Sequence, residues 1–131
     1  MWSMQNKRDS IRSSPKQPLT RGFLRSLLKQ IGNLNRTGMR AGNAGEFDMA
    51  FLNIEEALSL SQDLGKKCLE AKLLNNLGNL YTMNGTWDKA METYDRSMSL
   101  VTRHYGTQNI LYKTLQKNIG YLFDSKRVAS R

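Results

Sequence analysis

Residues that commonly carry catalytic or metal chemistry are scarce in this 131-residue chain. It holds one cysteine, Cys68, and one histidine, His104. A single cysteine excludes an internal disulfide and a zinc site built from several cysteines. A single histidine excludes a histidine metal cluster, and no base or nucleophile near it in the sequence forms a recognisable pair with it. These absences argue against an enzyme, and no cofactor is expected.

Long apolar runs are also missing. No run approaches the roughly 18 to 20 residues that span a bilayer, and the N-terminus lacks the uninterrupted apolar core of a secretory signal. Hydrophobic residues make up 39% of the chain, which supports one modest core at this length. We therefore expect a single soluble domain inside the cell, with no transmembrane segment.

Acidic residues are nearly absent from the first third of the chain. Residues 1–40 hold nine Lys or Arg and one acid, Asp9, whereas residues 41–131 hold eleven Lys or Arg and ten acids. The formal charge of +9 thus lies mainly at the front. Residues 1–18 also contain both prolines and many Ser, Lys, Arg and Gln, and show no apolar period. We expect a basic flexible leader there.

The rest of the chain shows helical periodicity interrupted by glycine. Apolar residues recur at steps of three and four, which predicts amphipathic helices. Thr20 is a candidate N-cap for the first helix, and Gly65 and Gly106 are candidate C-terminal stops. The expected helices cover about 20–43, 46–64, 67–84, 87–105 and 107–125. The predicted fold is all-α, with about five antiparallel helices.

These helices repeat with a period near 40 residues. Gly38, Gly78 and Gly120 are 40 and 42 residues apart. Three further pairs are each 40 apart, namely Phe47 and Trp87, Ala50 and Ala90, and Ile54 and Tyr94. We interpret this as two and a half copies of a helical hairpin in the order A-B-A-B-A. The domain would cover 19–126, with copies at about 20–65 and 66–106, a half copy at 107–126, and a polar tail at 127–131.

The glycine inside each first helix has an expected packing role. A glycine in mid-helix costs about 1 kcal/mol relative to alanine, so its presence favours close approach of another backbone. We expect Gly78 to face Ala90, and Gly38 to face Ala50. Trp87 and Tyr94 would fill the wider gaps beside them.

Residues 71–94 carry a family resemblance. The pattern Leu74-x2-Leu77-Gly78-x2-Tyr81, followed by Ala90-x3-Tyr94, resembles the tetratricopeptide repeat, with Leu in place of the usual Trp. The longer period and the Asn-Leu-Gly-Asn segment are similar to the extended variant of cell-polarity adaptors and kinesin light chains. The resemblance implies an α-α superhelix whose first helices line a concave wall that binds proteins.

The resemblance also implies which side chains face that wall. They would be Asn35 and Met39 in the first copy, Lys72, Asn75, Asn79 and Met83 in the second, and Lys117 and Tyr121 in the third. An asparagine can donate to and accept from a peptide backbone, so an Asn75–Asn79 ladder would suit an extended ligand. Lys117 could meet an acidic side chain or a terminal carboxylate. The alternative is that these residues are only solvated.

Other roles stay open at this stage. The basic leader could bind an anionic surface, a membrane or nucleic acid, nonspecifically and with strong salt dependence. Residues 1–32 also resemble a mitochondrial targeting segment, which stands beside the cytoplasmic location expected otherwise. The last helix shows apolar residues on more than one face (Leu111, Leu115, Ile119, Leu122 and Phe123), so it could cap the stack or form a weak homodimer. The chain could also be a fragment of a longer repeat array.

Overall fold

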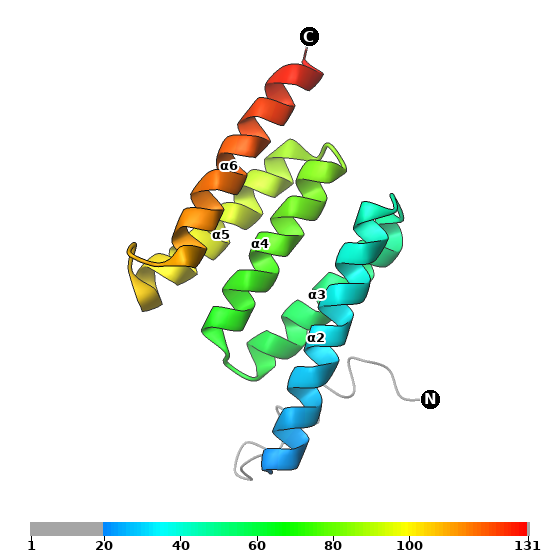
Figure 1. Cartoon of the computed structure of the whole chain (residues 1–131), viewed down its shortest axis with the longest axis vertical. Helices are drawn as coiled ribbons and strands as arrows, with labels where there is room; N and C mark the ends of the chain where they lie inside the picture. The colour runs from blue at the N-terminus through cyan, green and yellow to red at the C-terminus, as the bar shows by residue number, and fades with distance from the viewer. Residues whose placement is uncertain (1–19, 131) are drawn as a thin grey trace.

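The computed structural model describes residues 20–130 and is built from α-helices alone over that range (Figure 1). The helices are α2 (Arg21–Asn43), α3 (Phe47–Asp63), α4 (Lys67–Met83), α5 (Trp87–Tyr105) and α6 (Ile110–Ala129). The all-α repeat fold expected from the sequence is confirmed. The predicted leader over 1–18 lies outside the described residues. Within residues 20–130, no helix is long and apolar enough to cross a membrane.

The helix ends agree with the sequence in α2 and differ in α6. The Thr20 side chain accepts a hydrogen bond from the Phe23 amide at 3.0 Å, as expected for an N-cap. The α6 helix begins three residues later than predicted, because Asn109 caps it by accepting from the Tyr112 amide at 2.8 Å. It also continues to Ala129, beyond the predicted end at 125. Lys126 and Arg127 in its last turn complement the helix dipole.

The chain reverses at four glycines with left-handed backbone conformations. Their φ angles are 79° at Gly45, 67° at Gly65, 76° at Gly85 and 76° at Gly106. Residues with a Cβ rarely adopt this region, so glycine is the favoured residue at each reversal. These four turns set the alternating directions of the five helices.

The two complete hairpins pack through equivalent contacts. A Cβ added to Gly78 would lie 2.5 Å from Cε1 of Tyr94, and one added to Gly38 would lie 2.8 Å from Cγ1 of Ile54. Tyr94 and Ile54 are the residues that the 40-residue repeat aligns. The expected contact of Gly38 with Ala50 is confirmed, since a Cβ at Gly38 would lie 3.2 Å from the Ala50 carbonyl oxygen, whereas the atoms nearest to a Cβ at Gly78 belong to Tyr94 rather than Ala90. The missing side chain of each glycine makes room for a large residue of the second helix, Tyr94 or Ile54, which lies four residues after the alanine of the pattern.

The helices form two layers, and neighbouring helices lie closer together in one layer than in the other. The first helices of successive hairpins contact each other, α2 with α4 and α4 with α6, and Figure 1 shows them side by side in front of α3 and α5. The second helices α3 and α5, both fully described, make no such backbone contact. The layer whose members lie closer together is the inner side of a curved stack. We call the exposed side of α2, α4 and α6 the inner face.

The core consists of two clusters. The first core cluster lies between α2, α3 and α4 and includes Ile31, Ile54 and Leu77. The second core cluster lies between α4, α5 and α6 and includes Ala71, Tyr94 and Leu115, and the partly buried Tyr81 and Leu100 pack against both clusters.

Leu111, Leu115, Ile119 and Leu122 of α6 pack against α4 and α5 residues such as Tyr94 and Val101. Of the apolar residues that suggested a second apolar face, Phe123 alone is largely exposed, at 56%.

The side of α6 that would face a further second helix combines polar side chains with the exposed ring of Phe123, which aligns with Tyr81 of α4. Lys113 and Gln116 occupy the positions that Ala71 and Leu74 hold in α4, and nothing lies within 4 Å of a Cβ added to Gly120.

Candidate protein-binding surface

The eight side chains predicted to face a ligand all come from the three helices of the inner layer. They differ in how accessible they are. Lys72, Met83, Lys117 and Tyr121 are exposed, Asn35, Met39 and Asn79 are partly buried, and Asn75 is buried at 7% exposure. The prediction that they bind a ligand remains a prediction, but the structure separates the exposed members from those held by other parts of the chain.

Asparagine side chains join successive inner helices by two equivalent hydrogen bonds. Nδ2 of Asn76 on α4 donates to Oδ1 of Asn35 on α2 at 2.7 Å. Nδ2 of Asn118 on α6 donates to Oδ1 of Asn75 on α4 at 2.9 Å. Each donor lies two residues before the helix glycine, and each acceptor lies three residues before it. The asparagines of the repeat motif therefore hold the layer together, a role that the sequence reasoning missed.

A hydrogen bond from the buried residue Tyr94 fixes the orientation of the Asn79 side chain. The Tyr94 hydroxyl donates to Oδ1 of Asn79 and lies 3.4 Å from the Thr82 hydroxyl. Burial raises the pKa of the Tyr94 phenol above 10.0, while the hydrogen bond to Thr82 acts in the opposite direction. The phenol is therefore a neutral donor at physiological pH. Because the oxygen of Asn79 is engaged by Tyr94, its amide nitrogen is the group of that side chain left for a ligand.

Each first helix has an exposed cation beside the inner face, and in α2 it is Arg36, whose Nη2 donates to Oδ1 of Asn33. The guanidinium of Arg36 lies over Gly32, since a Cβ added to Gly32 would be 3.4 Å from Nη1 of Arg36. In the 40-residue repeat, Gly32 of α2 corresponds to Lys72 of α4. The charge of Arg36 therefore lies at the height along α2 that corresponds to the position of Lys72 along α4. Lys117 supplies the cation of α6. Across residues 20–130, the ion pairs are Lys67 with Glu70 and Arg127 with Asp124, and neither involves these three cations.

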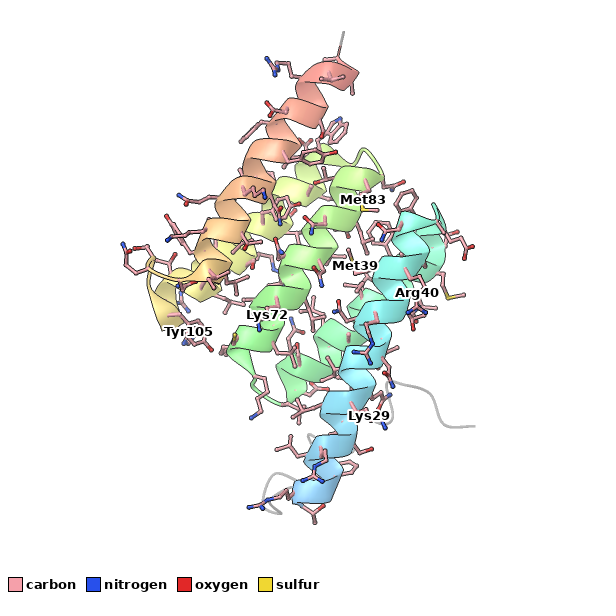
Figure 2. The ribbon with its side chains drawn as sticks, in the orientation of Figure 1. Lys29, Met39, Arg40, Lys72, Met83 and Tyr105 are labelled. Carbon is pink, nitrogen blue, oxygen red and sulfur yellow. The ribbon has the colours of Figure 1, made fainter. Side chains whose placement is uncertain are left out.

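Exposed apolar groups lie beside the cations. Met83 is 42% exposed and Tyr121 is 67% exposed, and both lie in the C-terminal halves of their helices. Met39 packs partly against the first core cluster. Figure 2 shows Met39 and Met83 at the same end of the seam between α2 and α4, with Lys72 toward the other end. The inner face thus has a cationic part and an apolar part.

A pocket of about 580 Å³ surrounds the N-terminus of α4. Its lining comes from the turn before α4, from α2 and from the end of α5, and includes Leu28, Lys66, Lys67, Lys72 and His104. Figure 2 shows Lys72 and Tyr105, another lining residue, at this end of the molecule. The cationic part of the inner face therefore continues into a positively charged hollow.

The chain is similar in sequence to proteins named Ycf3. The chain is 30% identical over 91 residues to the photosystem I assembly protein Ycf3 of Prochlorococcus marinus strain MIT 9303, covering 70% of this chain and 46% of that protein. It is 37% identical over 68 residues to Ycf3 of Rippkaea orientalis, covering 52% and 38%. The chain thus spans about half or less of these relatives. No protein-family model matches it, and no solved structure matches it.

Proposed function

We propose that this chain is a protein-interaction module of the tetratricopeptide type, which binds an extended peptide or helical segment of a partner on its inner face. The observation that carries the proposal is the set of exposed side chains on that face. Lys72, Lys117 and Tyr121 project from a layer of helices that internal hydrogen bonds already hold in register. A preorganised wall loses little conformational freedom when a ligand binds.

The repeated packing supports the tetratricopeptide type. Gly38 with Ile54 and Gly78 with Tyr94 are the same contact in two hairpins, formed by the residues that carry the family pattern. Stacked hairpins of this kind present an extended curved surface, which repeat proteins commonly use for binding. Fold alone does not assign a function, however, so the proposal depends on the side chains of the face.

The similarity to Ycf3 supports the same class of function. Those relatives are assembly proteins by name, and assembly requires contact with other proteins. For this chain we propose a role in bringing a protein component into a complex, with binding and no catalytic step. The matched segment is about half of the relatives or less, so the proposal concerns the binding surface rather than their whole activity.

Site-specific cross-linking tests the proposal. A photoreactive phenylalanine analogue would replace Tyr121 on the inner face, and in a matched control it would replace Leu52, which is 66% exposed on α3. Both variants should keep the wild-type melting temperature, because both positions are exposed. In cells that make this chain, we expect a discrete protein cross-link at 121 and none at 52. Cross-linking at 52 alone, or equally at both positions, would place the binding surface elsewhere.

A further inference from the structure

Charge is divided between the two layers of the stack. The outer helix α3 contains four acids and no Lys or Arg. The inner helix α2 contains five Lys or Arg and no acid. The inner helix α6 contains four Lys or Arg, and its acid, Asp124, is paired with Arg127 at 3.3 Å. The outer helix α5 has three acids and three Lys or Arg, so the inner layer is basic and the outer layer is acidic through α3.

No carboxylate neutralises the cations of the inner face within the described residues. Glu70 is the acid of α4, and it is 8% exposed. Its carboxylate accepts from Nε2 of Gln62 at 3.3 Å and lies 3.6 Å from Nζ of Lys67. It is thus held on the core side of the helix. Arg36, Lys72 and Lys117 face solvent without an acidic partner among residues 20–130.

The cations and the apolar groups form two rows across the three helices. Helical side chains lean toward the N-terminus of their helix, and Arg36 follows this rule by lying over Gly32. Its charge, at the level of Gly32 in the middle of α2, forms a row with those of Lys72 and Lys117. Met39, Met83 and Tyr121 form the second row, toward the C-terminal halves.

We propose that the occupant of the inner face is an acidic peptide segment that alternates carboxylate and apolar side chains. This inference rests on the proposed function, because it names the chemistry of the ligand for the same surface. Carboxylates of the peptide would pair with Arg36, Lys72 and Lys117, and its apolar side chains would contact Met39, Met83 and Tyr121. The strand would cross α2, α4 and α6 in turn.

The dimensions of the face suit a short segment. Packed helices lie 8–10 Å apart, so three of them span about 20 Å from first axis to last. An extended chain covers about 3.3 Å per residue, so about six or seven residues cross the layer. Exposed ion pairs contribute little affinity each. We therefore assign selectivity and association rate to the cations, and retention of the peptide to the apolar row.

A nucleic acid is the competing polyanion, and the apolar row argues against it. Proteins that bind single strands stack bases on aromatic side chains spaced along a basic groove. In the apolar row, Tyr121 is the aromatic, and the other two groups are the thioethers of Met39 and Met83. Flexible methionine side chains adapt to the aliphatic and aromatic side chains of peptides.

The test is a selection from a random library of about 12-residue peptides, displayed on phage and panned on three forms of the full chain. The first form is wild type. The second carries Arg36→Glu, Lys72→Glu and Lys117→Glu. The third is a charge-matched control with Arg96→Glu, Arg103→Glu and Lys113→Glu, three exposed cations outside the two rows. Thermal melting of each form establishes that it folds before panning.

We expect wild type and the control to enrich peptides in which Asp or Glu alternates with apolar residues. The second form, with Glu at positions 36, 72 and 117, should bind the best such peptide about tenfold or more weakly than wild type does. This difference in affinity should shrink at high salt. Enrichment of neutral or basic peptides on wild type would overturn the acidic ligand and leave the proposed function intact. Failure of wild type to enrich any peptide would overturn both. Displacement of the peptide by an equal concentration of a thymidine 20-mer would assign the face to nucleic acid instead.

Discussion

The ring of Tyr94 occupies the space that a side chain at Gly78 would need. A Cβ at residue 78 would lie 2.5 Å from Cε1 and 2.6 Å from Cδ1 of that ring, well inside van der Waals contact. Tyr94 is 1% exposed and its hydroxyl reaches Asn79 on the inner helix. This single contact therefore sets the spacing of α4 and α5 and also orients a side chain of the candidate binding face.

The first prediction concerns this contact. Gly78→Ala should lower the free energy of unfolding by about 1–3 kcal/mol, because overpacking against Tyr94 exceeds the gain in helix propensity. Gly120→Ala is the matched control, since Gly120 is the equivalent residue of α6 and a Cβ there meets nothing within 4 Å. That variant should gain up to about 1 kcal/mol. Urea denaturation measures both, and equal effects of the same sign would contradict the packing role.

The second prediction concerns the buried phenol. Tyr94→Phe should lower the free energy of unfolding by about 0.5–1.5 kcal/mol at pH 7, because it removes the hydrogen bond to Asn79. The raised pKa of Tyr94 means that the folded state favours the neutral phenol. Its contribution is complete below about pH 10, the pKa of a free tyrosine, and is lost as the pH rises through the folded pKa.

Urea midpoints between pH 7 and pH 11 measure this effect. The stability difference between wild type and Tyr94→Phe should shrink above about pH 10. Tyr105→Phe serves as the control, because Tyr105 is 48% exposed and at the end of α5. A difference that stays constant up to pH 11 would show that ionisation of Tyr94 is not linked to unfolding.

The repeat pattern predicted the large features of the fold because they follow from local physics. Apolar periodicity identified each helix, and glycines at the reversals are required by the backbone conformation that the structure shows at Gly45, Gly65, Gly85 and Gly106. The 40-residue offset also aligned Ile54 with Tyr94, which then proved to be equivalent in packing.

Contacts between helices were harder to predict, since they depend on rotation about each helix axis. Gly42 falls near the end of the first predicted helix and no contact was predicted for it, yet it is buried in α2 and sits against Leu80 of α4. Asn75 was predicted to face a ligand, yet its oxygen accepts from Asn118 of the next helix. A shift of one residue on a helix turns a side chain by about 100°, which is enough to move it from the inner face to the seam between helices.

The third prediction tests which side of α6 is packed. Leu115→Ala should cost about 2–5 kcal/mol, because Leu115 is 0% exposed and fills the second core cluster. Phe123→Ala on the same helix should change stability by about 0.5 kcal/mol or less, since Phe123 is 56% exposed. Thermal and urea denaturation compare the two. A large loss at Phe123 would indicate that this side of α6 is covered in solution, as it would be in a homodimer.

The fourth prediction concerns the asparagine bond between Asn118 and Asn75. Asn118→Ala leaves the oxygen of Asn75, which is 7% exposed, without this donor, at a cost of about 1–3 kcal/mol. The Asn75→Ala, Asn118→Ala double variant should then be more stable than the sum of the two single changes predicts, by about 0.5–1.5 kcal/mol. Gln116→Ala, on the outer side of α6, should combine additively with Asn75→Ala and serves as the control. An additive result for Asn75 with Asn118 would show that the bond contributes nothing, and that apolar contacts alone hold α6 against α4.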